Sequence, residues 1–262
     1  MTHSATSGIL TDWLAALEAR HLADLRVPEV TRALRALSSA YVHRRHKVAA
    51  QATLDSAGKR AAFALFYGPL HFLTIGHILS AVEATAAPPE AVIDLGCGTG
   101  VAGAAWALAA GRAPVVTGID RHPWAVAEAR WTYRHFRLRS HVLAGDLARM
   151  PRVARGSAIV AGYAMNELPE PARAAVETRL LDAAAAGARV LVVEPIARSI
   201  APWWDAFAGR VVAAGGRADE WRAAVDLPPL LRLFDKAAGL DHRELTARSL
   251  YIATSERAAS RI

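Results

Sequence analysis

The feature that most constrains the fold is a glycine-rich turn between an apolar run and a helix-type segment. Residues 91–100 read AVIDLGCGTG, and the next ten residues have the composition of a helix. A second apolar run, VVTGI at 115–119, ends in Asp120. Glycine lets the backbone approach a ligand where a Cβ would clash, and an acid at the tip of the next strand can accept two hydrogen bonds from a ribose diol. The pattern predicts an α/β protein with a nucleotide-type cofactor site.

The acid before the first glycine separates two classes of cofactor. Gly98, Gly100 and Gly103 also fit the G-x-G-x-x-G of nicotinamide and flavin proteins, in which the strand usually runs straight into the first glycine. Here Asp94 comes two residues before Gly96. A dinucleotide needs a helix N-terminus aimed at its pyrophosphate, which a nearby carboxylate would repel. The spacing therefore disfavours a dehydrogenase, while a plain glycine turn without a cofactor stays open.

The sequence D-L-G-C-G-T-G resembles motif I of class I S-adenosylmethionine (SAM)-dependent methyltransferases, commonly written [VI]-x-[DE]-x-G-x-G-x-G. SAM carries a sulfonium and an ammonium group rather than a phosphate, and a carboxylate near the turn suits both cations. The resemblance implies SAM as cofactor and S-adenosylhomocysteine as product. It implies cofactor contacts from the turn and from the tip of the next strand: Asp94, Gly96, Cys97, Gly98, Gly100, Asp120 and Arg121.

Composition bounds the class of protein. The chain has 262 residues, of which 53% are hydrophobic, enough for one large domain or a domain with an accessory segment. No apolar run approaches the roughly 20 residues that span a bilayer, and the N-terminus has no basic region followed by an apolar segment. The single cysteine, Cys97, has no partner for an internal disulfide. We expect a cytoplasmic protein with no membrane partner and no metal.

The net charge of +7 has local peaks, at 43–47 and at the arginines of 130–139. On a helix, Arg130, Arg134 and Arg137 fall on one face. A basic surface of this kind binds nucleic acid, although a solvated arginine face is the alternative. The sequence has no aromatic-interleaved RNA motif of a known type. Charge alone therefore leaves RNA binding open.

The N-terminal part of the chain is predicted to be helical. Apolar residues at 10–17 have i, i+3, i+4, i+7 spacing, which is typical of an amphipathic helix. Pro28 can open a second helix as its first residue. A third helical region covers 57–82, and Pro69 should end or kink it.

From residue 91 strands and helices alternate, which predicts a parallel sheet covered on both faces. We expect a Rossmann-like class I methyltransferase fold: a mostly parallel seven-stranded sheet with an N-terminal helical extension. The expected domains are the extension at 1–88 and a SAM-binding domain at 89–262. Two short strands are expected within 240–254. Other strands are expected near 91–95, 114–119, 141–145, 157–164 and 189–194, and helices near 101–110, 122–137, 170–186, 200–214 and 228–238.

Ligands of open α/β sheets bind at the carboxyl ends of the strands, so the residues there are the site candidates. Asp146 resembles the methyltransferase residue that binds the adenine amino group, with the Leu147 backbone beside it; an N-cap aspartate is the alternative. Asn166 and Glu167 lie where methyltransferases face the methyl group and the acceptor, and an Asx-turn is the alternative for Asn166. Glu167 is the carboxylate best placed to act as a base. Glu194 either lines the acceptor pocket or caps the fifth strand.

Two further motifs narrow the resemblance. YAMNELP at 163–169 and LVVEP at 191–195 look like the Rsm22-like family, methyltransferase-like proteins linked to the small ribosomal subunit. The likeness covers roughly residues 57–200 and implies an RNA acceptor, small-subunit rRNA. Family members typically carry downstream cysteines that bind a metal or an iron–sulfur cluster. This chain lacks them, so neither is expected, and a small-molecule acceptor stays open.

The segment before motif I adds two candidates. Tyr67 and His71 lie in the part of the chain that folds over SAM in many methyltransferases. Tyr67 is a candidate cofactor contact, and His71 is a second candidate base. We therefore predict a SAM-dependent methyltransferase that acts on an N, O or C atom of RNA or of a small molecule. The alternative is a SAM-binding ribosome-assembly factor without turnover, and the oligomeric state stays open.

Overall fold

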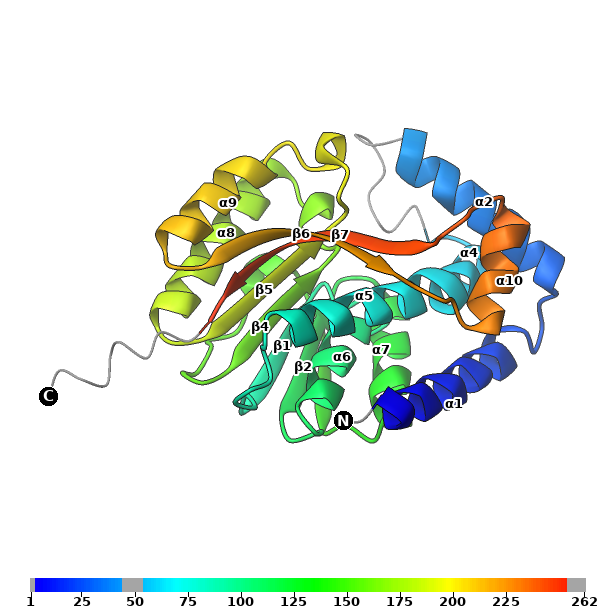
Figure 1. The fold of residues 1–262 in the computed structure, drawn as a ribbon, viewed down its shortest axis with the longest axis horizontal. Helices are drawn as coiled ribbons and strands as arrows, with labels where there is room; N and C mark the ends of the chain where they lie inside the picture. Colours follow the sequence, from blue (N-terminus) through cyan, green and yellow to red (C-terminus); the bar gives the residue numbers. More distant parts are fainter. Residues whose placement is uncertain (1–2, 44–53, 254–262) are drawn as a thin grey trace, which may run out of the picture. The chain divides into compact units, whose positions relative to one another are not determined.

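The computed structural model describes residues 3–43 and 54–253 (Figure 1). Most of the basic run at 43–47 lies outside the described residues. The chain forms two compact units. The helical unit contains Met1–Leu73 and Arg222–Leu245, and the sheet unit contains Thr74–Trp221 and Thr246–Ile262. The division expected at residue 88 stays a prediction about domains, and the compact units divide the chain at other positions.

A seven-stranded sheet has the order β3-β2-β1-β4-β5-β7-β6. Strands β1 to β5 pair in parallel, and β7 pairs antiparallel with β5. The order reverses direction between β1 and β4, so the loops after these two strands diverge there and leave room for a ligand. The strands are β1 (Ala91–Leu95), β2 (Val115–Asp120), β3 (Ser140–Ala144), β4 (Ala158–Gly162), β5 (Arg189–Glu194), β6 (Arg217–Ala224) and β7 (Glu244–Ile252).

Helices cover both faces of the sheet, as the alternation predicts (Figure 1). Helices α6 (Val101–Ala109) and α7 (Pro123–His135) pack on one face, against β1, β2 and β3. Helices α8 (Glu170–Ala185) and α9 (Trp204–Ala213) pack on the other, where buried aliphatic side chains of β1, β4 and β5 meet Leu180 and Phe207. The central strands are therefore buried on both sides and consist of near-continuous apolar runs. This confirms the predicted fold class.

The helical unit contains α1 (His3–His21), α2 (Val27–His43), α4 (Ala57–Ala62) and α10 (Pro229–Ala238). The α10 helix packs against α2, and Trp13 of α1 contacts Phe72 with ring centroids 5.3 Å apart. The predicted second helix forms, but it begins at Val27, so Pro28 is its second residue and not its first; the missing N–H of proline is not needed in the first turn. The C-terminal segment that carries α10 thus returns to the helical unit.

Pro69 is predicted to end or kink the third helix, and the prediction of a helix end is wrong. A π-helical turn, η1 (Phe63–Tyr67), links α4 directly to α5 (Gly68–Ala81), and the Gly68 N–H donates to the Phe63 carbonyl five residues earlier. The wider turn before the proline lets the chain stay helical around a residue that has no N–H. The stretch Ala57–Ala81 has a window of mean hydropathy 1.4 and the length of a membrane span, but 67% of that window is buried in the protein, as in a core helix.

The expectation of two strands within 240–254 is also wrong. That segment contributes the single strand β7, whose neighbour β6 lies before α10 in the sequence. The β6 sequence RADEWRAA has charged residues and one large apolar side chain, Trp221. It forms an edge strand whose residues are exposed or half-buried, so no run of apolar residues marks it.

Candidate active site

The glycine turn between β1 and α6 has a left-handed backbone at alternate residues. Gly96, Gly98 and Gly100 have φ values of 63°, 51° and 81°, a region that side chains with a Cβ adopt at a cost. The Cys97 N–H donates to the Ile119 carbonyl at 3.0 Å, which ties the turn to the end of β2. The three alternating glycines are therefore required by the path of the chain.

Gly96 also lies in close contact with two neighbouring loops. A Cβ at this position would lie 2.6 Å from Ala164 Cβ, after β4, and 3.3 Å from a methyl of Leu147, after β3. The absence of a side chain thus lets three strand-end loops meet at one point. Leu147, predicted as an adenine neighbour, is buried at this junction.

Asp94 stabilises the glycine turn by accepting hydrogen bonds. Its Oδ2 accepts hydrogen bonds from the Gly103 N–H at 2.7 Å and from the Tyr133 hydroxyl at 2.9 Å. Burial raises the pKa of Asp94 to about 6, while the bonds from Gly103 and Tyr133 lower it and the charge of Asp120 raises it. Its Oδ1 is buried and has no hydrogen-bond partner within the described residues. The carboxylate is fully buried, so the structure shows it holding the start of α6 rather than facing solvent.

The Tyr133 hydroxyl gives a prediction that depends on pH. The folded-state pKa of Asp94 lies above its ordinary value of 3.8, so ionisation of Asp94 costs stability as the pH rises from about 4 through about 6. Tyr133→Phe removes a donor to the ionised form and should raise this pKa further. We expect a loss of about 1.5–3 kcal/mol at pH 8, where Asp94 is ionised, and a smaller loss at pH 5.

Chemical denaturation of the wild type and the variant at both pH values measures this difference. Tyr251→Phe is the matched control, because Tyr251 is also buried in the sheet unit and its pKa is raised by burial without a carboxylate contribution. An equal loss at pH 5 and pH 8 for Tyr133→Phe would mean that the hydroxyl does not stabilise the Asp94 charge.

Asp120 lies at the end of β2 and faces the turn. Its Oδ2 accepts from the Gly98 N–H at 2.9 Å and its Oδ1 from the His122 N–H at 2.8 Å. Each carboxylate oxygen has a second lone pair, so these bonds orient the group and leave acceptor capacity for a ligand.

Two other predicted cofactor contacts lie next to Asp120 and within the turn. Arg121, which follows Asp120, is exposed. The Cys97 thiol is buried, and burial raises its pKa well above the ordinary value. Cys97 therefore packs within the turn as a thiol.

Asp146 caps a short helix, η2 (Leu147–Arg149), after β3. Its Oδ1 accepts from the Ala148 N–H at 2.9 Å, and the residue is exposed. This is N-cap geometry, which is the alternative to an adenine contact that the sequence analysis gives for Asp146. The second oxygen of the carboxylate is not used by that cap, so adenine binding stays a prediction.

Asn166, in the short helix η3 (Met165–Glu167) after β4, is held on both sides of its amide. Its Nδ2 donates to Glu194 Oε2, and its Oδ1 accepts from the Trp203 indole N–H at 3.0 Å. Glu194 Oε1 also accepts from the N–H groups of Met165 and Asn166, at 2.8 and 3.2 Å. We call the side chains of Asn166, Glu194 and Trp203 the amide clamp. The clamp fixes the loop after β4.

Glu194 is fully buried, and burial raises its pKa to about 8 against the lowering effect of the Asn166 and Met165 N–H groups. Trp203 was missed by the sequence reasoning, because its bond to Asn166 joins residues 37 positions apart. Tyr163 was also missed: it has a left-handed backbone (φ 59°) directly after β4, a strained position of the kind that gathers at functional sites. No sequence pattern marks either feature.

Glu167 follows Asn166 and is exposed at the same strand end. The pKa of its carboxyl is raised to about 7, first by desolvation among the surrounding protein atoms and then by Asp120, with Arg121 opposing the shift. The loops after β2 and β4 therefore bring Glu167, Asp120 and Arg121 within electrostatic reach. A carboxyl with a pKa near 7 is suited to take a proton at neutral pH.

Tyr67 and His71, predicted as a cofactor contact and a base, belong to the helical unit. Their rings lie 6.2 Å apart, and Phe63 lies 6.0 Å from Tyr67 and 6.2 Å from His71. Burial lowers the pKa of His71 to about 3 and raises that of Tyr67, although a hydrogen bond with Ser38 opposes the rise. His71 is therefore held neutral in an aromatic cluster of the helix, and its predicted role as a base stays a prediction.

A comparison with protein families matches the part of the chain that contains this site. Residues 92–187 match the model of a family described as "Methyltransferase domain". This segment runs from β1 to the end of α8 and contains the glycine turn, Asp120 and the amide-clamp residue Asn166. The chain has the class I methyltransferase fold. No curated protein sequence matches it.

Solved structures share this fold at low sequence identity. A mitomycin 7-O-methyltransferase has a TM-score of 0.50 and 16% identity, over 96% of this chain and 76% of that chain. The magnesium protoporphyrin IX methyltransferase of Synechocystis PCC 6803 with bound SAM has a TM-score of 0.47 and 13% identity, over 88% and 99%. A SAM-dependent O-methyltransferase from Thermotoga maritima has a TM-score of 0.48 and 15% identity, over 70% and 65%. In the described part of this chain, no group of three or more His, Cys, Asp or Glu residues is placed to hold a metal.

Proposed function

We propose that this protein is a SAM-dependent methyltransferase. The observation that carries the proposal is the hydrogen bond between Asp120 and the Gly98 N–H, which joins the acidic tip of β2 to the glycine turn. A ribose diol needs a carboxylate in this position, and the adenosyl part of a ligand needs a backbone that it can approach closely. Both are supplied at the carboxyl ends of adjacent parallel strands.

The residues of the turn fit the rest of the cofactor. Asp94 Oδ1 and the Thr99 hydroxyl are buried without a hydrogen-bond partner among the described residues. A carboxylate oxygen accepts from an ammonium, and a hydroxyl donates to a carboxylate, which are the two groups of an amino-acid moiety. The buried charge of Asp94 also favours a cation above the turn. SAM, when bound, supplies an electrophilic methyl group on its sulfonium.

The chain's own residues then position the acceptor and remove its proton. The amide clamp holds the loop after β4 in one conformation, so Asn166 and Glu167 keep fixed places beside the turn. Glu167, with a carboxyl pKa of about 7, takes the proton from an N–H or O–H acceptor. An acceptor that is already deprotonated needs only the positioning.

Asp120→Ala should weaken SAM binding by about 1–3 kcal/mol, because the diol hydroxyls lose their acceptor. Calorimetric titration with SAM measures the change. Asp120→Asn serves as a second variant, since the asparagine carbonyl can retain the bond to the Gly98 N–H. Asp182→Ala is the control, because it removes the same charge from an exposed position on α8. Unchanged affinity in folded Asp120→Ala would remove Asp120 from the site.

We also propose that the acceptor is RNA and that the chain is a divergent member of the Rsm22-like family acting in the cytoplasm. Support comes from the YAMNELP and LVVEP motifs and from the net charge of +7. A small-molecule enzyme should show little RNA affinity at about 0.15 M salt, where binding by charge alone is weakened. Methyl transfer from SAM into RNA rather than into small molecules is the expected result.

A further inference from the structure

A basic surface lies at the edge of the sheet, on β3 and on the helix α7 that packs against it. It comprises the exposed part of α7, the turn after it and the edge strand β3, and we call it the α7–β3 surface. Arg130, Arg134, Arg137 and Arg139 are exposed on it, as is His141 of β3. All belong to the sheet unit. Arg130 and Arg134 lie one turn apart on α7, as the sequence predicts, but α7 ends at His135 and Arg137 lies in the turn after it, with a left-handed φ of 55°, so the prediction of a helical face that includes Arg137 is wrong.

The cations of this surface are not neutralised by acids. Within the described residues, none of the four arginines forms an ion pair with a carboxylate. Between residues 121 and 145 the sole acidic residue is Glu128, which is fully buried. Arginines elsewhere in the described chain, such as Arg217 and Arg243, do pair with neighbouring aspartates. The α7–β3 surface therefore keeps an uncompensated positive charge.

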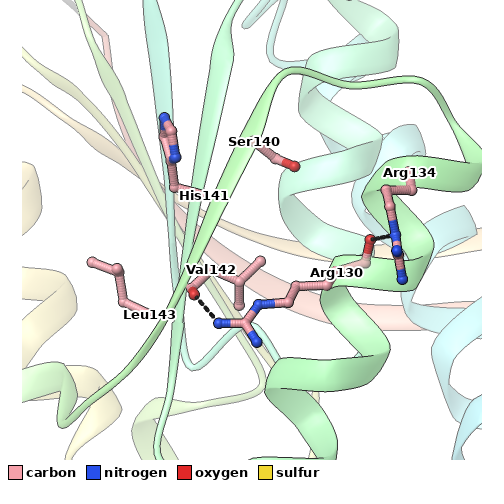
Figure 2. Close-up of a pocket in the computed structure, with 6 residues that line it drawn as sticks. All are labelled: Arg130, Arg134, Ser140, His141, Val142 and Leu143. Atoms are coloured by element: carbon pink, nitrogen blue, oxygen red, sulfur yellow. Dashed lines mark hydrogen bonds between the residues drawn. The ribbon is translucent and has the colours of Figure 1, made fainter.

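Backbone carbonyls hold the side chains of Arg130, Arg134 and Arg139 in place without removing their charge. The Arg130 guanidinium donates to the Val142 carbonyl of β3 at 2.9 Å, and Arg134 Nε donates to the Arg130 carbonyl at 3.3 Å (Figure 2). Arg139 donates to the Ala113 carbonyl. A guanidinium has five N–H donors, so each keeps donors for an anion. With Ser140, His141 and Leu143, Arg130 and Arg134 line an open pocket of about 430 Å³.

The helix that carries Arg130 and Arg134 also carries a pair of aromatic rings. Trp131 and His135, one helical turn apart on α7, stack with centroids 5.5 Å apart and an interplanar angle of 26°. Both residues are half-buried. Leu143 of β3 is 49% exposed, an unusual position for a large apolar side chain. The surface thus combines ordered cations with rings and an apolar side chain.

We propose that the α7–β3 surface binds single-stranded RNA. The arginines contact successive phosphates, and the Trp131–His135 pair provides a platform on which a base stacks. Two alternatives explain the arginines but not the ring pair. Arginines that only contact solvent require no ring pair, and an anionic lipid surface has no base that could stack on the rings. A single strand exposes the faces of its bases, whereas a duplex hides them. The proposal rests on the proposed function with RNA as acceptor and adds the surface that binds the RNA, and binding here does not depend on SAM.

The test is fluorescence anisotropy of the full-length protein with a 5′-labelled single-stranded RNA of about 20 nucleotides, across a salt series. Arg134→Ala/Arg137→Ala should weaken binding at least tenfold at low salt. It should also reduce the slope of log K against log salt by about 1.4, since each contact with a single strand contributes about 0.7. Arg222→Ala/Arg243→Ala is the control with the same net charge, because both arginines are exposed and ion-paired.

A second pair of variants tests the ring platform. Trp131→Ala should weaken binding by about 5- to 150-fold, the range of one base stacked on an aromatic ring. Trp131→Phe should retain most of the affinity. Thermal unfolding and SAM titration of each variant show whether it is folded and whether its cofactor site is intact, so a failure here is distinguishable from a failure of the proposed function.

Three outcomes would overturn the proposal. The control pair could lose as much affinity as Arg134→Ala/Arg137→Ala, which would mean that net charge alone drives binding. Trp131→Ala could bind as tightly as Trp131→Phe, which would remove the platform. The protein could bind vesicles containing phosphatidylserine and not RNA, which would assign the surface to a membrane.

Discussion

Replacing Gly96 with alanine is expected to destabilise the protein by about 2–5 kcal/mol and to weaken SAM binding more than tenfold. Two costs add. The left-handed φ of 63° costs an L-residue about 1–2 kcal/mol. The new methyl would lie 2.6 Å from Ala164 Cβ, and overpacking of this kind typically costs about 1–3 kcal/mol. To relieve the contact, the turn or the loop after β4 must move, and both form the proposed cofactor site.

Gly111→Ala separates the two costs. Gly111 has a similar φ of 72°, but a Cβ there would meet nothing within 4 Å. This control should lose only the backbone cost, about 1–2 kcal/mol, and keep its SAM affinity. Chemical denaturation and SAM titration of both variants give the comparison. Equal losses for Gly96→Ala and Gly111→Ala would show that close contact at Gly96 has no energetic consequence.

At pH 9, above the pKa of about 8 at which Glu194 ionises, Glu194→Gln should cost about 2–3 kcal/mol of stability. The Trp203 indole nitrogen can only donate, so Asn166 must turn its Oδ1 toward Trp203 and its Nδ2 toward Glu194. A glutamine at position 194 keeps one oxygen for the backbone N–H groups and must turn an NH2 group toward the Asn166 NH2. Two donors then face each other, and methyl transfer should fall because Asn166 loses its orientation.

A double-mutant cycle tests this account of the amide clamp. Trp203→Phe removes the indole donor, so in Glu194→Gln/Trp203→Phe the Asn166 amide is free to rotate and accept from the glutamine. The combined loss should be smaller than the sum of the single losses by about 0.5–3 kcal/mol. Glu177→Gln, which changes a buried glutamate of α8 paired with Arg210 of α9, should leave methyl transfer unchanged. Additive losses in the cycle would show that the three side chains do not act as one unit.

Much of the fold was predictable, because local physical chemistry decides it. The apolar run of β1 ends at the acid and the glycines of the turn. The turn has a left-handed backbone at three positions, and glycine is the residue that adopts this conformation at least cost. The strands β1, β4 and β5 are buried on both faces, so their apolar runs mark them in the sequence. The positions of Asp120 and Asn166 follow, since the carboxyl ends of parallel strands share one edge.

The features of the fold and the site that the sequence analysis missed depend on contacts between residues that are distant in the sequence. β6 is an exposed, charged edge strand, and its place beside β7 is set by pairing rather than by its own pattern. The π-helical turn at Phe63–Tyr67 is a response to the proline that follows. Trp203 and Tyr133 acquire their roles because the fold brings their donors to Asn166 and Asp94. No spacing within a single segment carries that information.

The measurement that tests the central claim most directly is calorimetric titration of the purified protein with SAM, S-adenosylhomocysteine and NADH. The glycine turn, the buried charge of Asp94 and the carboxylate of Asp120 predict micromolar binding of both adenosyl ligands and no binding of NADH. Absence of adenosyl binding by the folded protein would contradict the account, and the turn would then be a structural feature without a cofactor.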